Sequence, residues 1–251
     1  MDARTIVTPD EVRLAVHVRQ SPDARATIVL AHGFSSSASH PDITALADAL
    51  LARGLSVITY DARGHGSSGG SCSLGYDERL DVAAVTDAAG ELGRPVVLVG
   101  ISMGGIAVLR HAATPEADVR AVVTVSCPAR WTVPRNPRGV LSAGLTHTRL
   151  GRVVAARRLG VRVAPPGPRG PTPVELAASV RVPLAVVHGA RDPFIPSSNA
   201  HALHGAAAVP GGLTIVPGRW HAHDSVAMVV VAGTVDTLAQ RAPDQVARPP
   251  R

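Results

Sequence analysis

The chain has 251 residues, of which 45% are hydrophobic, and this is enough to bury the core of one sizeable domain. Its 25 basic residues are all arginine, which excludes a Schiff-base lysine and a lysine-dependent phosphate loop. The net charge of +6 is weak evidence for a nucleic-acid partner, because only 2% of the residues are aromatic and single-strand binders need rings for stacking. We therefore expect no nucleic-acid partner.

The sequence predicts neither a signal peptide nor a membrane span. Its first residues lack a basic region followed by an apolar run, and no window approaches about 18 uninterrupted apolar residues. We therefore expect a cytoplasmic protein. Cys72 and Cys127 do not have the spacing of metal ligands, and we expect both thiols to be free.

The first part of the chain alternates predicted strands and helices. Residues 12–18 alternate in polarity as a half-exposed strand does, which fits an antiparallel edge of a mixed sheet. Residues 26–31 form a continuous apolar run, typical of a strand that is buried on both faces, and they end at His32-Gly33-Phe34. A helix over 42–53 and a strand over 55–60 then complete a β-α-β unit with a right-handed crossover.

The loop after residue 60 contains Gly64-x-Gly66-x-x-Gly69, which imitates a dinucleotide-binding fingerprint. In such a site the helix must begin on the glycines to hold a pyrophosphate. Here the helical pattern starts only near Tyr76 and continues to about residue 92. We interpret the glycine segment as a structural turn.

Residues 96–109 are the most informative stretch, because a buried apolar run breaks at Gly100-Ile101-Ser102-Met103-Gly104 and resumes as a helix. A G-x-S-x-G turn between strand and helix lifts its serine clear of the sheet, where a base can remove the hydroxyl proton. The N-terminus of the following helix directs backbone N–H groups at an incoming oxyanion. Ser102 is thus a candidate nucleophile, and the N–H groups of Phe34 and Met103 are candidate oxyanion donors.

After a strand at 119–125 the pattern changes, because eight prolines interrupt residues 128–177. We interpret this stretch as an insertion, or lid, over the site, with one helix between about 140 and 160. Nine arginines and no acidic residue lie between residues 130 and 169. Such a lid could steer anionic substrates or bind an acidic partner. It could equally be a solvated face. The candidate steering residues are Arg152, Arg157 and Arg158.

Two more strands, over 183–188 and 213–216, precede Asp192 and His221, and a last helix is expected over 223–239. The carboxyl ends of strands in an open α/β sheet converge on one crevice, so Ser102, Asp192 and His221 are expected to meet there. His221 would take the serine proton and return it to the leaving group, while Asp192 would orient the imidazole. The predicted organisation is a core domain of residues 1–127 and 178–241, an insertion over 128–177 and a disordered tail over 242–251.

Each of these residues also has a simpler explanation. Asp192 before a proline could be a turn aspartate, and His221 could be a loop histidine; their joint occurrence in the order Ser, Asp, His favours catalysis. His223 competes for the role of base, but the Pro217-Gly218 turn delivers His221 directly. The segment from His221 to Asp224 lacks the remaining ligands of an H-x-H-x-D-H pattern, so no metal is expected.

Five segments together resemble the α/β-hydrolase superfamily, over nearly the whole chain apart from the insertion and the tail. They are His32-Gly33-Phe34, Asp61-Ala-Arg-Gly-His-Gly66, Gly100-Ile-Ser-Met-Gly104, His188-Gly-Ala-Arg-Asp192 and Gly218-Arg-Trp-His221. The resemblance implies a mostly parallel sheet of about eight strands, helices on both faces, and a short lid after the sixth strand. It also implies a serine nucleophile and no cofactor. Esterases, acylglycerol lipases and serine aminopeptidases share these motifs.

The leading hypothesis is a serine hydrolase that cleaves a carboxylic ester or thioester of a small-molecule acyl substrate through an acyl-enzyme. A serine peptidase or aminopeptidase-like hydrolase is the enzymatic alternative, and it would need an acidic or polar anchor that the insertion lacks. A non-catalytic hydrolase-like binding protein is an alternative of another class. Such a protein would be expected to lose one member of the triad, and none is lost here.

Overall fold

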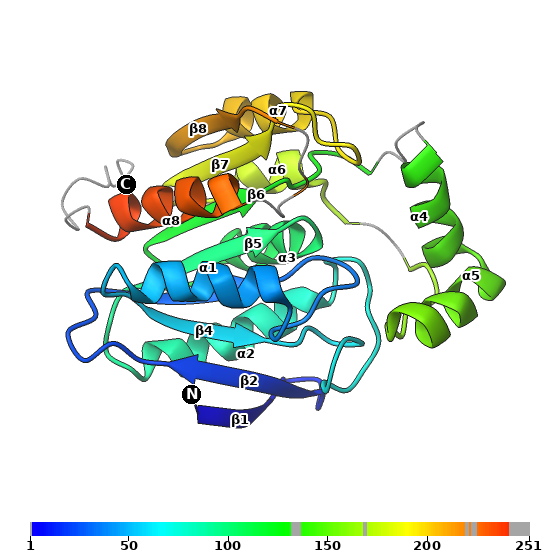
Figure 1. The fold of residues 1–251 in the computed structure, drawn as a ribbon, viewed down its shortest axis with the longest axis horizontal. Helices are drawn as coiled ribbons and strands as arrows, with labels where there is room; N and C mark the ends of the chain where they lie inside the picture. Colours follow the sequence, from blue (N-terminus) through cyan, green and yellow to red (C-terminus); the bar gives the residue numbers. More distant parts are fainter. Residues whose placement is uncertain (1, 132–136, 168–169, 219–220, 222–224, 241–251) are drawn as a thin grey trace.

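The computed structural model of this chain describes all residues except 1, 132–136, 168–169, 219–220, 222–224 and 241–251, so the predicted tail over 242–251 lies outside the described residues. An eight-stranded sheet in the order β1-β2-β4-β3-β5-β6-β7-β8 forms its centre (Figure 1). The β1–β2 and β2–β4 pairs are antiparallel, and the other pairs are parallel. The predicted fold class is confirmed. The strands are β1 (Asp2–Val7), β2 (Arg13–Arg19), β3 (Thr27–Ala31), β4 (Ser56–Tyr60), β5 (Val96–Ile101), β6 (Ala121–Val125), β7 (Leu184–Gly189) and β8 (Pro210–Val216).

The edge of the sheet near the N-terminus is β1, which pairs with β2 along its whole length. β2 is antiparallel to its neighbours, as the alternation of residues 12–18 predicts, but it is not the edge strand that the sequence predicts. Most residues of β1 are exposed, so this strand lacks the apolar alternation by which a half-buried strand can be predicted.

Helices cover both faces of the sheet and divide the core into two layers (Figure 1). The central strands β3, β4, β5 and β6 are buried along their whole length, because each carries helices on both sides. One layer lies under α1 (Pro41–Leu51) and α8 (Ser225–Gln240), and the other lies under α2 (Glu78–Gly90), α3 (Met103–Ala112), α6 (Pro173–Ala177) and α7 (Ser198–Ala206).

Part of the insertion after β6 projects beyond the sheet as a helical hairpin (Figure 1). We call residues 137–159 the lid hairpin; it consists of α4 (Pro137–His147), α5 (Arg149–Val154) and a π-helical turn, η1 (Ala155–Leu159). Its two helices pack tightly, because a Cβ atom at Gly151 would overlap the carbonyl of Gly144. α6 belongs to the predicted range 128–177 but lies in the core, where Leu176 and Ala177 are buried.

The lid hairpin is joined to the core where it ends. Gly160 adopts a left-handed conformation with φ +66 and closes η1. Beyond it, the N–H of Cys72 donates to the Arg162 carbonyl at 2.6 Å, and the N–H of Arg162 donates to the Gly64 carbonyl at 2.9 Å. The N–H of Ala164 donates back to the Cys72 carbonyl at 2.8 Å. The insertion therefore returns to the core along the glycine-rich loop.

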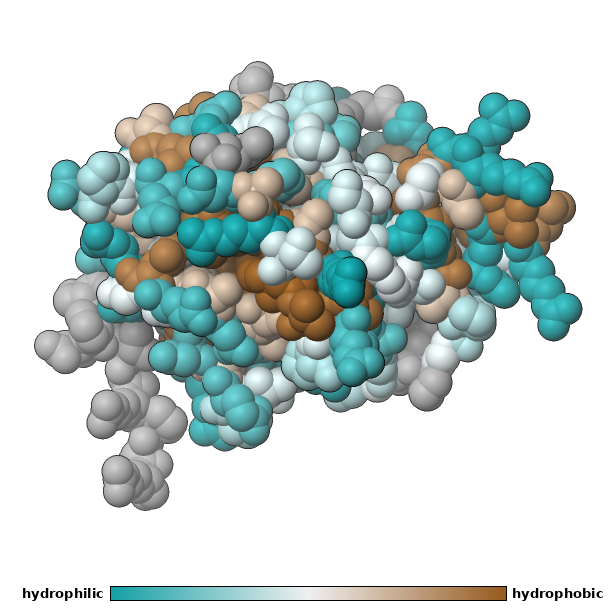
Figure 2. Space-filling model, turned by 90° about the horizontal axis from the view of Figure 1, so that it is seen from below, coloured by the Kyte–Doolittle hydropathy of each residue, from teal (hydrophilic) through white to brown (hydrophobic). Residues whose placement is uncertain are grey.

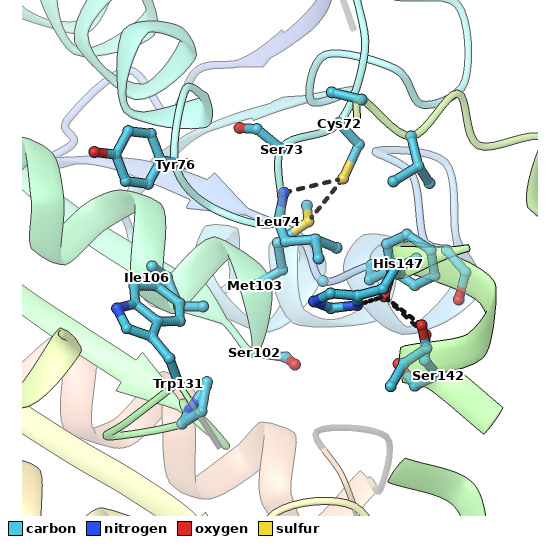
Figure 3. Close-up of a pocket in the computed structure, with 18 of the residues that line it drawn as sticks. Cys72, Ser73, Leu74, Tyr76, Ser102, Met103, Ile106, Trp131, Ser142 and His147 are labelled. Carbon is cyan, nitrogen blue, oxygen red and sulfur yellow. Dashed lines mark hydrogen bonds between the residues drawn. The ribbon is translucent and has the colours of Figure 1, made fainter. Parts of the chain in front are cut away.

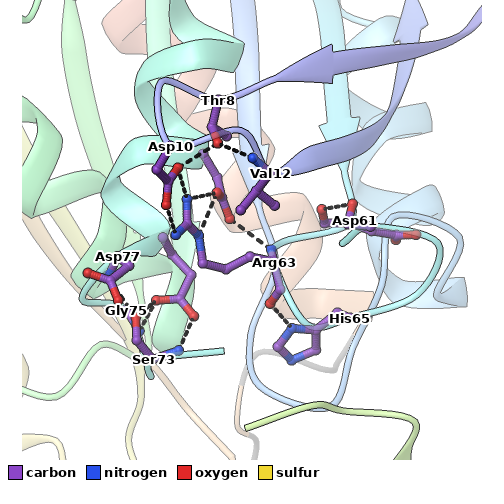
Figure 4. A network of polar contacts seen from close by, with 12 residues as sticks. Thr8, Asp10, Val12, Asp61, Arg63, His65, Ser73, Gly75 and Asp77 are labelled. Atoms are coloured by element: carbon purple, nitrogen blue, oxygen red, sulfur yellow. Dashed lines mark hydrogen bonds and ion pairs between the residues drawn. The ribbon is translucent and has the colours of Figure 1, made fainter. Parts of the chain in front are cut away.

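That loop is a structural turn held by buried charges (Figure 4). The Asp61 carboxylate accepts hydrogen bonds from the N–H groups of Ala38 and Ser67, each at 2.8 Å. Gly66 has φ +47, and a Cβ atom there would overlap this carboxylate. Because α2 begins only at Glu78, no helix N-terminus meets these glycines in the described loop.

Arg63 forms the second part of this network (Figure 4). Its Nε and its backbone N–H donate to the two carboxylate oxygens of Asp81, each at 2.8 Å, and its Nη1 donates to Asp10 at 2.7 Å. The side chains of Arg63 and Asp81 are 5% and 0% exposed, whereas that of Asp10 is 41% exposed. Asp81 is therefore the buried partner and Asp10 the outer one.

Replacing Asp81 with alanine should lower the free energy of unfolding by about 3–5 kcal/mol, because it leaves a buried guanidinium without its inner partner. Replacing Asp10 with alanine is the matched control and should remove about 1 kcal/mol, as expected of a half-exposed ion pair. Urea unfolding of the three proteins measures both losses. Equal losses would contradict the assignment of the two partners.

Acid should remove the contribution of Asp10. The hydrogen bond from Arg63 lowers the pKa of Asp10 from 3.8 to about 2, against the opposing effect of burial. A carboxyl whose pKa is lower in the folded protein than in the unfolded chain stabilises the fold at pH values above the unfolded pKa. This stabilisation is lost as the pH falls toward the pKa of the folded state. The stability difference between the parent and Asp10→Asn should thus be constant above about pH 5 and shrink toward pH 2.

Candidate active site

Ser102 occupies a sharp turn between β5 and α3 (Figure 3). Its φ of 51 and ψ of −110 are unfavourable for a residue with a side chain, and such strain is found mainly at functional sites. A Cβ atom at Gly100 would lie 2.4 Å from the Gly104 carbonyl oxygen, and one at Gly104 would lie 2.3 Å from the carbonyl oxygen of Ala31. Both glycines of the G-x-S-x-G segment are therefore needed for strand and helix to pack this closely.

Ser102, His221 and Asp192 form one hydrogen-bonded chain. The Ser102 Oγ lies 3.0 Å from His221 Nε2, and His221 Nδ1 lies 2.7 Å from Asp192 Oδ2. The three side chains come from segments that follow β5, β8 and β7, at one edge of the sheet. The other histidine considered for this position, His223, lies outside the described residues.

Asp192 is held as an anion. Its side chain is 0% exposed, and its Oδ1 accepts hydrogen bonds from the N–H groups of Phe194 and Ile195 at 2.8 and 2.9 Å. Burial opposes ionisation, but the hydrogen bond from His221 and these backbone donors outweigh it and lower the pKa of Asp192. An ionised carboxylate only accepts, so the proton of the His221–Asp192 hydrogen bond is on His221 Nδ1. In the neutral imidazole with this proton on Nδ1, Nε2 accepts from the Ser102 hydroxyl.

His188 and Phe194 also support this arrangement, and neither was a candidate site residue in the sequence. His188 is buried, and its Nε2 donates to the Ile195 carbonyl at 2.9 Å, which holds the loop that carries the two N–H donors. Burial lowers the pKa of His188, so it is neutral. The Phe194 ring lies 5.1 Å from the His221 ring between centroids, and the guanidinium carbon of Arg138 lies 5.4 Å from the Phe194 ring centroid. The lid hairpin thus contacts the site through Arg138.

The candidate oxyanion donors are the N–H groups of Met103, which follows Ser102, and of Phe34, in the loop after β3. Met103 is the first residue of α3, so its N–H has no partner within the helix. In the described part of the chain, the N–H of Phe34 donates to no residue. A Cβ atom built on Gly33 would lie 3.4 Å from the Ser102 Cβ, which shows how closely this loop approaches the serine.

His32 fixes the loop that carries Phe34. Its ring is buried, and its Nε2 accepts a hydrogen bond from the N–H of Ala62 at 2.9 Å. Nδ1 therefore carries the proton and donates to the Gly33 carbonyl at 2.7 Å. Burial lowers the pKa of His32, which keeps this ring neutral. The His32-Gly33-Phe34 segment is thus held by its own first side chain.

A cavity of about 690 Å³ opens over Ser102 (Figure 3). Most of its wall is apolar, and the lid hairpin adds the polar side chains of Ser142, Thr146 and His147. Among its described lining residues, Arg130 is the only arginine; Arg152, Arg157 and Arg158 do not line it. The main apolar residues of the wall are Leu74, Tyr76, Met103, Ile106, Trp131, Val163 and Phe194.

One side of the cavity is rigid. The Tyr76 hydroxyl accepts a hydrogen bond from the N–H of Gly170 at 3.0 Å, and the Trp131 indole N–H donates to the Gly170 carbonyl at 3.3 Å. Behind these rings lies the buried Arg110, whose guanidinium carbon is 3.9 Å from the Tyr76 ring centroid. Both aromatic rings are therefore fixed before any substrate enters.

Over the described residues, no three His, Cys, Asp or Glu side chains are grouped as a metal site requires. Cys72 and Cys127 are buried free thiols. None of the helices in the described ranges has the length and apolar character that would let it cross a membrane.

The family model described as "Serine aminopeptidase, S33" matches residues 22–166. No curated protein matches the chain. Among solved structures, an esterase from Pyrococcus furiosus is similar with a TM-score of 0.72 and 19% identity, over 94% of this chain and 90% of that one. A thermophilic esterase from Thermogutta terrifontis gives 0.71 and 18%, over 96% and 100%. The esterase RhEst1 from Rhodococcus sp. gives 0.67 and 21%, over 94% and 99%.

Proposed function

The chain belongs to the serine aminopeptidase S33 family, within the α/β-hydrolase superfamily, and on that premise we propose that it is a serine hydrolase that cleaves carboxylic esters. The observation that carries the proposal is the hydrogen-bonded chain from Ser102 through His221 to Asp192. Several similar structures are named esterases, which supports ester hydrolysis as the activity. The mostly apolar wall of the cavity supports a substrate with an uncharged acyl group.

In the proposed reaction, the Ser102 oxygen attacks the ester carbonyl while its proton passes to His221 Nε2. The carbonyl oxygen becomes an oxyanion, which the N–H groups of Phe34 and Met103 stabilise. Collapse of this intermediate breaks the bond to the alcohol, and His221 returns the proton to the departing oxygen. Water then attacks the acyl-enzyme by the same steps in reverse, releasing the acid and restoring the serine.

Asp192 acts through His221 in this scheme. Its charge stabilises the imidazolium that exists while the proton is on Nε2, and its hydrogen bond keeps the ring turned toward Ser102. Apart from the substrate and the water that it consumes, the scheme uses only groups of the chain itself. The scheme assigns Ser102, His221 and Asp192 as catalytic, and Phe34 and Met103 as the oxyanion hole.

Peptide hydrolysis is the competing activity, because the family model carries the name of an aminopeptidase. An aminopeptidase binds the charged amine of its substrate, and a carboxylate is the natural partner for that group. Asp77 is the single carboxylate among the described residues that line the cavity, and it is exposed. This lining supports an ester over a peptide.

A substrate panel tests the proposal. p-Nitrophenyl esters and acyl thioesters of graded acyl length are compared with amino-acid p-nitroanilides, each with the Ser102→Ala variant as control. Ester hydrolysis that requires Ser102, at a kcat/KM well above that for the anilides, is the expected result. Faster turnover of the anilides would assign the chain as a peptidase, and no serine-dependent turnover would favour a binding protein.

Ionic strength should reveal whether the arginines of the insertion steer substrates. If Arg152, Arg157 and Arg158 attract anions, kcat/KM for an ester with a carboxylate on its acyl group should fall as the salt concentration increases. The reason is that salt ions screen the attraction between the arginines and the carboxylate. A neutral ester of the same length is the control and should change little. Equal salt dependence for both esters would contradict steering and leave the hydrolase proposal intact.

A further inference from the structure

The lid hairpin exposes most of the large apolar side chains on the described surface. Nine such side chains are exposed in the described residues, and six of them fall within the 23 residues from 137 to 159. Their exposed fractions run from 39% for Val154 to 75% for Leu150. Solvent-exposed apolar residues this concentrated mark a contact surface rather than random scatter. The six are Val140, Leu141, Leu150, Val153, Val154 and Leu159.

These side chains are not covered by the core. The hairpin extends away from the sheet in Figure 1, and its helices pack on each other through Gly144 and Gly151. Figure 2 shows hydrophobic surface at the right-hand end of the molecule, with hydrophilic side chains projecting around it. The small residues make the contact inside the hairpin, and the large apolar ones face outward.

The same surface is strongly basic. Residues 119–174 contain no aspartate or glutamate, and the arginines of this stretch gather on and beside the hairpin. Arg157 and Arg158 lie in η1 between the exposed Val154 and Leu159. The arginines of the hairpin and its C-terminal end are Arg138, Arg149, Arg152, Arg157, Arg158 and Arg162.

We propose that the lid hairpin docks the protein on the surface of a lipid bilayer that contains acidic headgroups. Short helices that combine exposed leucine and valine with arginine lie in the interface of such bilayers, with their apolar side chains below the phosphates. Arginine also binds phosphate through two parallel hydrogen bonds. This docking surface is separate from the chemistry assigned to Ser102 and does not depend on it.

The positive charge of the lid hairpin argues against a second copy of the chain as the partner that binds this surface. A two-fold dimer places the same patch on both sides of the interface, so arginines would face arginines. The hairpin offers no carboxylate to pair with them. An anionic lipid surface supplies the opposite charge, and fluid acyl chains can accept side chains that protrude singly.

Docking would also bring the cavity to the lipid. Gly139, Ser142, Ala143, Thr146 and His147 of α4 line the cavity above Ser102. An ester dissolved in the bilayer would therefore enter beside the hairpin rather than through water.

Vesicle binding tests the proposal in the full-length chain. All proteins carry Ser102→Ala, so that turnover cannot alter the lipid, and they are sedimented with vesicles of phosphatidylcholine alone or mixed equally with phosphatidylglycerol. We expect binding to the mixed vesicles that weakens with salt. Val153→Asp should weaken it by about tenfold or more, because it removes an inserted apolar group and adds repulsion. Val229→Asp, the same change at an exposed valine of α8, should leave it unchanged.

The arginines are tested in the same way. Replacing Arg157 and Arg158 together by glutamine should weaken binding about 25-fold, from roughly fivefold per arginine at an anionic surface. The control pair, Arg79 and Arg181, is exposed elsewhere on the surface and should have no effect. Matching thermal-unfolding midpoints establish that every variant is folded.

Three results would overturn the proposal. One is an absence of binding to the mixed vesicles. Another is an equal loss of binding in Val153→Asp and Val229→Asp. The third is a dimer in solution that Val153→Asp abolishes, since that outcome would make a second copy the occupant.

Discussion

Replacing Ser102 with alanine is expected to lower kcat by about 10⁶-fold, the loss seen when the nucleophile of a serine triad is removed. The reason is chemical, because the Ser102 oxygen is the proposed nucleophile and its hydroxyl lies 3.0 Å from His221 Nε2. The fold should be unaffected. Alanine keeps the Cβ atom of the strained turn, and the N–H of residue 102 still donates to the Val125 carbonyl.

Ester turnover and labelling by a fluorophosphonate measure this effect together. The matched control is Ser126→Ala, which replaces a buried serine at the end of the neighbouring strand β6, also at a positive φ of 49. It should keep its labelling and most of its activity. If Ser102→Ala retained turnover, or if the label moved to another residue, the proposed mechanism would be wrong.

Replacing Asp192 with asparagine should lower kcat by about 10⁴-fold with little change in KM. The Asp192 carboxylate accepts from His221 Nδ1 and from two backbone N–H groups. An amide that turns its NH₂ toward the ring forces the other tautomer, in which His221 Nε2 carries a proton and cannot accept one from Ser102.

The control for this variant is Asp77→Asn, which removes an exposed carboxylate from the rim of the same cavity. It should change kcat little. Steady-state kinetics on one neutral ester compare the two variants with the parent. A near-normal kcat for Asp192→Asn would mean that another group orients the imidazole.

The central sheet and the turn at Ser102 could be predicted because their signals are local. β3 and β5 are short apolar runs bounded by polar residues or glycine, and each glycine around Ser102 is required by a close backbone approach. The positions of Asp192 and His221 followed from the rule that parallel strands end at one edge.

Other elements lack such a local signal, or carry one that the prediction did not use. β1 is mostly exposed, and it joins the sheet through its pairing with β2. The insertion was predicted to hold one helix, but the extended backbone of Thr148, whose hydroxyl accepts from the Gly151 N–H and caps α5, divides it into α4 and α5. α6 could have been found, because Thr172 and Glu175 form a capping box that is readable as T-x-x-E.

The contacts around the candidate site could not be predicted from the sequence, because they join segments that are far apart in the chain. The Phe194 ring meets His221 and Arg138, which are 27 and 56 residues away in the chain. The Trp131 indole meets Gly170 across the whole lid hairpin. No periodicity or motif encodes such pairs, which depend on how the insertion folds back over the sheet.

The way in which the lid hairpin is attached lets the hairpin evolve separately from the sheet and the turn at Ser102. Cys72, Arg162 and Ala164 are joined through backbone N–H and carbonyl groups, so these bonds do not depend on the side chains that the hairpin carries. Hairpins of other lengths and compositions can therefore replace residues 137–159 without altering the sheet or the turn at Ser102. Substitutions in the hairpin can change which compounds are bound while Ser102, Asp192 and His221 stay the same.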